Sequence, residues 1–131
     1  MNRSGIDPGL LPLRFLRPVL WRPLLPIMNA ILRILPHSFG REIRMKRHII
    51  PVRQGGTISA AVIEPLAPER PSPCLIFYHG GAFMLETAPH HVRLAEQFAL
   101  RVPCAVIMPK YRLAPRHPFP EPAEDCYAAY E

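Results

Sequence analysis

Residues 74–83, Cys-Leu-Ile-Phe-Tyr-His-Gly-Gly-Ala-Phe, decide the fold of this chain. The first five are apolar or aromatic and follow a Pro-Ser-Pro entry, which predicts a strand buried on both faces over 74–78. Gly80 and Gly81 then allow backbone N–H groups to point at a ligand without obstruction by side chains. One use of a His-Gly-Gly stretch after a central strand is an oxyanion hole, in which backbone donors stabilise charge that develops during acyl transfer. The alternative is a tight turn after a core strand.

The length and composition fit one globular domain. The 131 residues are 49% hydrophobic and 20% charged, which argues against a disordered chain and leaves room for a single core. Proline is overrepresented, with 18 residues where about 7 are expected at the usual frequency of roughly 5%. The prolines form no repeat, so we interpret them as punctuation of loops and helix starts.

The charge is uneven along the chain. Residues 1–53 carry ten Lys and Arg and two acidic residues, a net of +8, whereas residues 54–131 carry six and eight, a net of −2. A basic leader can meet nucleic acid or an anionic membrane surface. The aromatic residues are not interleaved with the basic ones and no nucleic-acid-binding motif is visible, so we expect no nucleic-acid partner.

The three cysteines, Cys74, Cys104 and Cys126, show no Cys-x-x-Cys spacing. An odd, widely spaced set argues against a disulfide framework and against a zinc site. Cys74 and Cys104 lie in apolar, strand-like runs, where cysteine acts as a small buried hydrophobe in a reducing compartment. We therefore expect a cytoplasmic protein without a metal or a cofactor.

Residues 10–35 form an apolar stretch that four arginines interrupt well below the length that spans a bilayer. A secretory signal is not expected, because an unbroken apolar core and a small-residue cleavage site are both missing. Closely spaced prolines limit any helix to short pieces, of which Met28–Leu35 is the best candidate. We favour residues 1–40 as a helical cap over a cleft. Two alternatives stay open: peripheral contact of residues 10–35 with a membrane, and an Arg-rich transit peptide.

The following segments alternate strand and helix. Residues 42–50 and 57–63, separated by a Gln-Gly-Gly turn, predict an antiparallel hairpin. Residues 90–101 place apolar side chains at helical intervals, and Thr87 and Pro89 suit the start of this helix. The apolar run 105–108 is then the next parallel strand. Strand, helix and strand at this spacing form a βαβ unit, so the expected class is α/β with a right-handed crossover.

A second informative stretch covers residues 111–120, Tyr-Arg-Leu-Ala-Pro-Arg-His-Pro-Phe-Pro. Its prolines predict a rigid, extended connector that leads into a helix over 121–131. Pro122 suits the first turn of that helix, and the acidic residues beside it complement the helix dipole. These residues by themselves predict structure and no chemistry.

Together the two stretches resemble the hormone-sensitive-lipase-like branch of the α/β-hydrolases. The likeness rests on His-Gly-Gly-Ala-Phe at 79–83, on the 111–120 stretch and on Glu-Asp-Cys-Tyr-Ala-Ala at 124–129. It covers residues 41–131, the N-terminal part of the α/β-hydrolase core, while residues 1–40 match only in position, where the family has its helical cap. The resemblance implies hydrolysis of small carboxylic esters by a serine nucleophile through an acyl-enzyme.

The resemblance also implies roles for the loop that follows the strand. Gly81 and Ala82 correspond to the positions whose N–H groups help to form the family's oxyanion hole, and Gly80 gives the turn its freedom. His79 would hold the shape of the loop. It is not the family's catalytic histidine, which lies much later in those chains.

Several positions depart from the family's pattern. Ala82 stands where glycine is commonest, so it keeps an N–H donor but narrows the allowed backbone. Lys110 and Arg116 occupy positions that are usually acidic, which questions the family's ion pairing around Arg112. Glu86 replaces a usual small residue in the loop.

The catalytic triad is expected outside these residues. The nucleophile elbow needs a serine between two spaced glycines, and none of the four serines meets this test: Ser4, Ser38, Ser59 and Ser72. The triad order in this fold is Ser, acid, His, and Glu131 lies in the helix that should precede the serine's strand. We interpret His90, His91 and His117 as surface or loop residues. The expectation is the N-terminal part of a hydrolase, close to inert alone.

Two other classes of function stay open. The chain could be a ligand-binding relative that does not hydrolyse, as the gibberellin receptor is within this family, or an interaction fragment that docks on membranes through its basic leader. In the family the 74–78 strand pairs with the nucleophile strand. Without that neighbour it would be an apolar, unpaired edge, so we expect the isolated chain to aggregate or to be only partly ordered.

Overall fold

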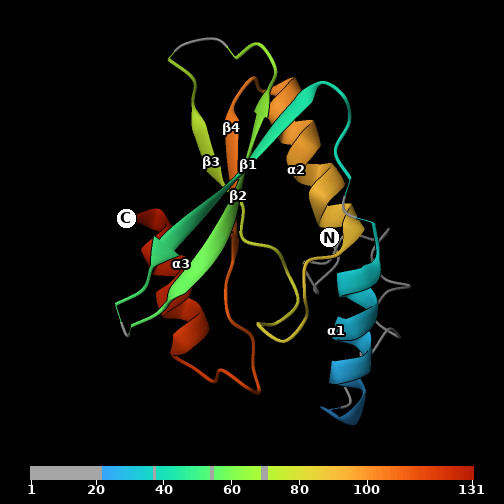
Figure 1. Ribbon diagram of the computed structural model, residues 1–131, viewed down its shortest axis with the longest axis vertical. Coiled ribbons are helices and arrows are strands. Elements are labelled where there is room, and N and C mark those ends of the chain that lie inside the picture. The colour runs from blue at the N-terminus through green and yellow to red at the C-terminus, as the bar shows by residue number, and fades with distance from the viewer. Residues whose placement is uncertain (1–21, 37, 54, 69–70) are drawn as a thin grey trace, which may run out of the picture.

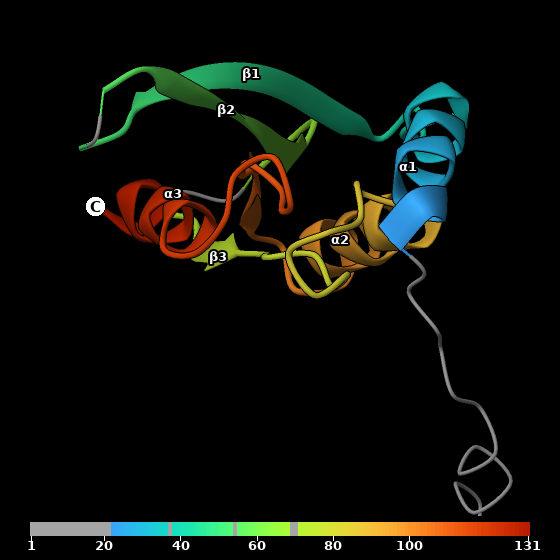
Figure 2. The ribbon, with the colours of Figure 1, turned by 90° about the horizontal axis from the view of Figure 1, so that it is seen from below.

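The computed structural model describes residues 22–131 apart from positions 37, 54, 69 and 70. Predictions for residues 1–21, which include much of the expected cap and Ser4, lie outside the described residues. Figure 1 shows a twisted sheet with helices α2 and α3 beside it. Figure 2 confirms that α1 and α3 lie at opposite ends of the molecule.

The strands form one mixed sheet in the order β1-β2-β4-β3 among the described residues. β1 (Ile43–Pro51) and β2 (Thr57–Pro65) are the predicted antiparallel hairpin. β4 (Ala105–Lys110) pairs antiparallel with β2 and parallel with β3 (Cys74–Ile76). Because α2 (Pro89–Arg101) connects the two parallel strands, the predicted βαβ unit and the α/β class are confirmed.

The turn between β1 and β2 depends on its glycines. Gly55 and Gly56 have φ angles of 85° and 88°, a region that side chains other than glycine's rarely allow. The Val52 N–H donates to the Gly56 carbonyl at 3.2 Å, and the Gly55 N–H donates to the Val52 carbonyl at 3.0 Å. The hairpin therefore closes where the Gly-Gly pair predicts it.

The core lies between α2 and the sheet. Ala95 and Ala99 are one helical turn apart on the buried face of α2, and their small side chains let the helix approach the strands closely. The buried members of this cluster are Ile63, Ala95, Ala99, Cys104, Val106 and Met108. Cys104 is buried as expected, whereas the prediction for Cys74 is wrong, because that side chain is exposed at the sheet edge.

β3 is shorter and less buried than the sequence predicts. It ends at Ile76, and the pairing continues through one more bond, from the Phe77 N–H to the Ile107 carbonyl at 2.8 Å. Its residues are exposed or half-buried, not buried on both faces. The reason is its place in the sheet: β4 is its only neighbour among the described strands. The expected edge position of this strand is thus confirmed.

The helices begin where their prolines allow. α1 (Leu25–Ile34) starts three residues before the predicted Met28, because Pro26 lies in its first turn, where proline is tolerated. α3 (Glu121–Tyr130) has Pro122 in its first turn and acidic residues beside it, as predicted. α2 packs on β2 and β4, while α3 contacts β1 and β4. Among the described residues, no helix has the length and apolar character that crossing a bilayer requires.

The connector over 111–120 is folded, and the prediction of an extended segment is wrong. The His117 N–H donates to the Leu113 carbonyl at 3.0 Å, which closes a turn within the connector. The Ala114 N–H donates to the Phe83 carbonyl at 2.8 Å, which joins the connector to the loop after β3. Prolines fix individual φ angles, but these bonds decide the path of the chain.

Candidate active site

The residues after β3 form a compact loop, here called the glycine loop (residues 79–86). Gly81 has a φ of 134°, and a Cβ at this position would lie 2.9 Å from the Leu85 Cβ, so only glycine fits. Ala82 and Phe83 follow with φ angles of 53° and 57°, a left-handed conformation that costs about 1–2 kcal/mol for each such residue. The freedom expected of Gly80 is not used, because its φ lies outside this region. The positive φ angles occur instead at Gly81, Ala82 and Phe83, one to three residues after Gly80.

The glycine loop leaves backbone donors available. The carbonyl of Gly81 accepts the N–H groups of Met84 at 2.9 Å and Leu85 at 3.1 Å, which closes the loop on itself. Among the described residues, no acceptor bonds the N–H of Gly80, Gly81 or Ala82. Successive backbone N–H groups in such a turn form a concave site that suits a negatively charged oxygen.

His79 lies buried beneath the loop. Its Nδ1–H donates to the Gly80 carbonyl at 2.9 Å, and its ring stacks on Tyr111 with centroids 4.5 Å apart. The Tyr111 hydroxyl donates to the His79 carbonyl. Burial lowers the pKa of His79 and raises the pKa of Tyr111 to about 12, so at neutral pH the imidazole is neutral and the phenol keeps its hydrogen. The two rings therefore support the start of the loop without carrying charge.

Helix α1 is tied to the far end of the glycine loop by Asn29. The Asn29 Nδ2 donates to the Met84 carbonyl at 2.8 Å, and its Oδ1 accepts the Glu86 N–H at 2.9 Å. One side chain thus satisfies a backbone acceptor and a backbone donor of the loop. Sequence reasoning missed this residue, because no local pattern connects positions 55 and 57 residues apart.

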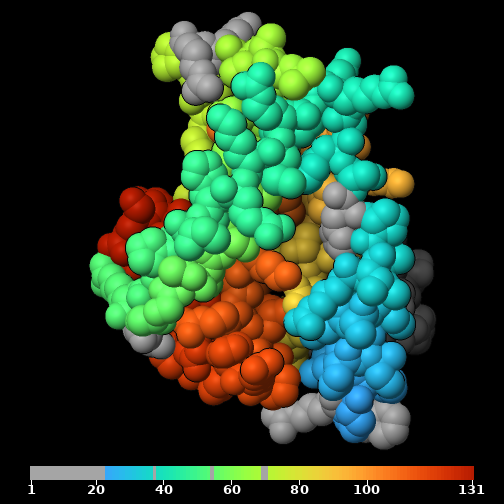
Figure 3. Space-filling view, viewed as in Figure 1, coloured from blue at the N-terminus to red at the C-terminus, as the bar shows by residue number. Residues whose placement is uncertain are grey.

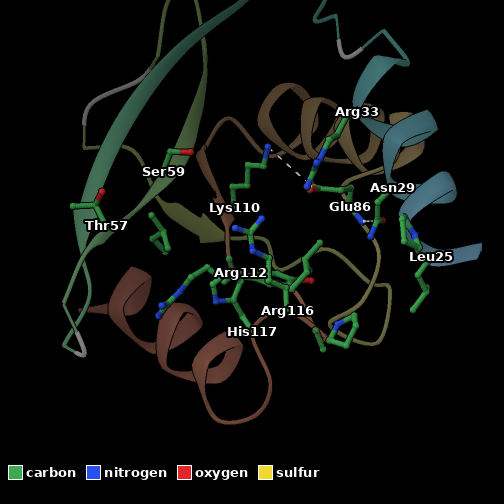
Figure 4. Close-up of a pocket in the computed structure, with 16 residues that line it drawn as sticks. Leu25, Asn29, Arg33, Thr57, Ser59, Glu86, Lys110, Arg112, Arg116 and His117 are labelled. Atoms are coloured by element: carbon green, nitrogen blue, oxygen red, sulfur yellow. Dashed lines mark hydrogen bonds and ion pairs between the residues drawn. The ribbon is translucent and has the colours of Figure 1, made fainter. Parts of the chain in front are cut away.

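Glu86 is the acidic centre of this contact. Its side chain is 8% exposed and forms an ion pair with Arg33 of α1 at 2.7 Å. Lys110, at the end of β4, lies 3.9 Å from the other carboxylate oxygen. Figure 4 shows Arg33 and Lys110 reaching Glu86 from α1 and from β4. In the sequence, Glu86 was noticeable only because it departs from the family's pattern. Its partners, Arg33 and Lys110, are brought to it by the fold.

The ion pairing around Arg112 is intact, which corrects the doubt raised by Lys110 and Arg116. Asp125, which is fully buried in α3, accepts bonds from the Arg112 side chain at 2.7 and 2.9 Å and from its backbone N–H at 2.8 Å. Glu121 adds a contact of 2.9 Å. These hydrogen bonds and charges raise the pKa of Arg112, led by the bond to Asp125. The partners come from α3, so basic residues at 110 and 116 do not remove them.

An apolar groove of about 510 Å³ runs between α1 and the glycine loop. Its lining includes carbon-rich side chains from α1, from the glycine loop and from the residue before α2, together with Glu86 and two histidines: Met28, Ile31, Leu32, Gly80, Gly81, Leu85, Glu86, Ala88, His90 and His91. The volume lies within the range of small-molecule sites. Two of the three residues with an available backbone N–H, Gly80 and Gly81, therefore border an apolar groove.

A second, more basic cleft of about 710 Å³ lies along the other side of α1. Figure 3 shows the surface hollowed between α1 and the loop after β4. Arg33, Lys110 and Arg116 surround this cleft (Figure 4). Ser59 lines it from β2, away from the groove that holds Gly80 and Gly81. In the described part of the chain, no cluster of three or more His, Cys, Asp or Glu could hold a metal ion.

Comparisons with known proteins identify the fold of this chain and the enzymes that it resembles. Residues 75–131 match the family model described as alpha/beta hydrolase fold. An esterase of Acinetobacter venetianus is 31% identical over 107 residues, which are 81% of this chain and 32% of that protein. A 2-hydroxyisoflavanone dehydratase of Glycyrrhiza echinata is 39% identical over 84 residues, which are 61% of this chain and 26% of that protein.

Two solved structures with a similar fold are also esterases. An esterase of Pyrobaculum calidifontis has a TM-score of 0.62 and 33% identity, with 82% of this chain and 34% of that chain covered. A thermostable carboxylesterase cloned from a metagenomic library has a TM-score of 0.67 and 29% identity, with 82% and 36% covered. The chain therefore has the α/β-hydrolase fold. Its motifs resemble those of the hormone-sensitive-lipase-like branch, and it spans about a third or less of the length of the curated relatives above.

Proposed function

We propose that this chain forms the oxyanion-hole part of a carboxylic-ester hydrolase. Gly81 and Ala82 donate their backbone N–H groups to the ester's carbonyl oxygen as it becomes an alkoxide, and Gly80 lines the same site. Removal of one such donor typically lowers kcat by about 10²–10³-fold. The observation that carries the proposal is the pair of N–H groups without an acceptor in the described chain, held in backbone of positive φ, with Gly81 lining an apolar groove.

The positions of His79 and α1 support the same proposal. His79 holds the first peptide of the loop through its bond to the Gly80 carbonyl, and Asn29 holds the last. Preorganised donors need no rearrangement when charge develops, which is the source of their catalytic effect. In this proposal α1 acts as part of the cap expected over residues 1–40, and it covers one side of the site.

The serine, acid and histidine of the triad are proposed to lie outside the 131 residues, so the chain alone should hydrolyse no ester. The test joins residues 1–131 to the C-terminal two-thirds of the Pyrobaculum calidifontis esterase. We expect this fusion to cleave p-nitrophenyl butyrate, and neither the chain alone nor a fusion with the nucleophilic serine replaced by alanine to do so. A fusion that melts cooperatively but releases no p-nitrophenol contradicts the proposal.

A second candidate is elimination of water from a hydroxy ketone. The observation that favours it is the 39% identity to a 2-hydroxyisoflavanone dehydratase over 61% of this chain. The same backbone donors would stabilise the enolate oxygen that forms when a proton leaves the carbon beside the carbonyl. Incubation of the fusion with a β-hydroxy ketone separates the two functions, because loss of water produces a conjugated enone with strong ultraviolet absorption.

A further inference from the structure

His91 has one ring nitrogen committed to the fold. It lies in the first turn of α2, where its Nδ1 accepts the Ala88 N–H at 3.0 Å. His91 is the third residue of the helix, and it accepts the N–H of the N-cap residue Ala88 as the Glu or Gln of a capping box does. A nitrogen that accepts a bond carries no hydrogen, and the ring is then neutral with its hydrogen on Nε2.

The other nitrogen faces the glycine loop. A Cβ placed on Gly80 would lie 3.9 Å from Nε2, and His91 lines the apolar groove together with Gly80 and Gly81. Within the described chain, Nε2 has no acceptor, and no buried side-chain nitrogen lacks a partner. Nε2 is therefore accessible, and His91 is one of the residues that line the groove.

Neighbouring rings keep His91 in this orientation. The rings of His90 and Phe77 lie 3.9 and 6.3 Å from its ring, measured between centroids, and the His79 ring lies at 5.5 Å. Burial, followed by the charges of His90 and His79, lowers the pKa of His91. At neutral pH the side chain is therefore a fixed, uncharged donor.

The groove favours a neutral ligand. Its walls are mostly carbon, and the charge of Glu86 is paired with Arg33. Moving an ionised ligand into such walls without a partner is costly, whereas a carbonyl oxygen needs only a hydrogen-bond donor. The chemical class that fits is a neutral ester or ketone with an apolar chain.

We infer that His91 is a binding residue of this groove, whose Nε2–H donates to the carbonyl oxygen of a neutral, apolar ester or ketone. It adds a side-chain donor beside the backbone of Gly80 and Gly81, which line the same groove. For the ester this rests on the proposed function, whereas binding of a ketone does not require hydrolysis.

Two substitutions separate the bond that His91 accepts from Ala88 from the bond that it would donate in the groove. The side-chain oxygen of Asn can occupy the place of Nδ1, so His91→Asn keeps the bond from the Ala88 N–H and removes the groove donor. The side-chain nitrogen of Gln can occupy the place of Nε2, so His91→Gln keeps the groove donor and removes the bond from the Ala88 N–H. In the fusion described above, we expect His91→Asn to lower kcat/KM for p-nitrophenyl hexanoate by about tenfold or more with an unchanged Tm. We expect His91→Gln to lower Tm and to retain most of the activity. Full activity in His91→Asn, or loss of activity in His91→Gln with an unchanged Tm, would overturn the inference.

A second measurement does not depend on hydrolysis. With ring-labelled histidine in the same fusion, 2-octanone should shift the Nε2–H resonance that His91→Asn removes, whereas octanoate, its charged counterpart, should not. A shift without any esterase activity would leave this inference standing while the proposed function fails. Hydrolysis by the fusion without a shift would overturn the inference and leave the proposed function standing.

Discussion

Asn29 and Glu86, 57 residues apart in the sequence, are joined by a bond of 2.9 Å from the Glu86 N–H to the Asn29 side chain, which also donates to the Met84 carbonyl at 2.8 Å. This amide connects a helix of the expected cap to the loop that carries the proposed donors. The glycine loop is therefore held from two directions, by His79 and Tyr111 from below and by α1 from the side.

Asn29→Ala should loosen the end of the glycine loop. It removes two part-buried hydrogen bonds, each worth about 0.5–1.5 kcal/mol, and leaves one backbone donor and one backbone acceptor of the loop without this partner. We expect a loss of about 1–3 kcal/mol in the free energy of unfolding and faster amide exchange at Glu86. Ile27→Ala, on the exposed side of the same helix, is the matched control and should leave the exchange unchanged. Equal amide exchange at Glu86 in the two variants would contradict the role of Asn29 in holding the end of the glycine loop.

The pair of Arg33 and Glu86 should be stronger than a surface ion pair. The Glu86 side chain is 8% exposed while Arg33 is 64% exposed, so the attraction is only partly screened by water. We expect a coupling of about 1 kcal/mol in a double-mutant cycle with Arg33→Met and Glu86→Gln. The exposed pair of Arg53 and Glu131 serves as the reference. A coupling free energy no larger than that of the reference pair would mean that the burial of Glu86 does not strengthen its attraction to Arg33.

Asp125→Ala should be the most damaging single change. It leaves the Arg112 guanidinium without its buried partner and the Arg112 N–H without an acceptor. Breaking a buried pair in this way costs about 3–5 kcal/mol. Glu121→Gln is the control, since this carboxylate is 28% exposed and bonds the same arginine. Urea denaturation should show a much smaller loss for the control, and similar midpoints for the two variants would refute this account.

Ala82→Gly should not destabilise the chain, although the same change in a helix does. At φ 53° glycine removes a cost of about 1–2 kcal/mol, which exceeds the extra entropy of the unfolded glycine. Ala30→Gly, at an exposed position in α1, should lose about 1 kcal/mol. The test is the difference between the two Tm shifts, which should have opposite signs. A loss at position 82 equal to that at position 30 would contradict the left-handed backbone.

The fold should lose stability in mild acid through His79 and His91. The pKa of each is lowered from 6.5 in the folded chain, mainly by burial, so the unfolded chain binds protons first as pH falls. The stabilisation is fully present above pH 6.5 and decreases as pH falls below it through the folded values. Glu86 and Tyr111 face His79, and His90 faces His91, so these groups share the environment. His91→Asn should reduce the slope of Tm against pH between 7 and 5, and His48→Gln, at an exposed position, should not.

Much of the fold follows from local patterns in the sequence. The Gly-Gly turn, the alternation of strands and helix, and the prolines in the first turns of α1 and α3 act within a few residues of where they occur. Their backbone preferences therefore need no knowledge of the rest of the molecule. The two motifs that resemble the hydrolase branch belong to the same level, and the expected edge position of β3 followed from that resemblance.

The tertiary structure decided what distant residues do to one another. It placed Asn29 and Arg33 against the glycine loop and gave Arg112 its partners from α3. It also folded the 111–120 connector. The positive φ angles, which the sequence predicted at Gly80, occur at Gly81, Ala82 and Phe83. These contacts join segments far apart in the chain, and their energies depend on burial and mutual geometry, which no local pattern of residues encodes.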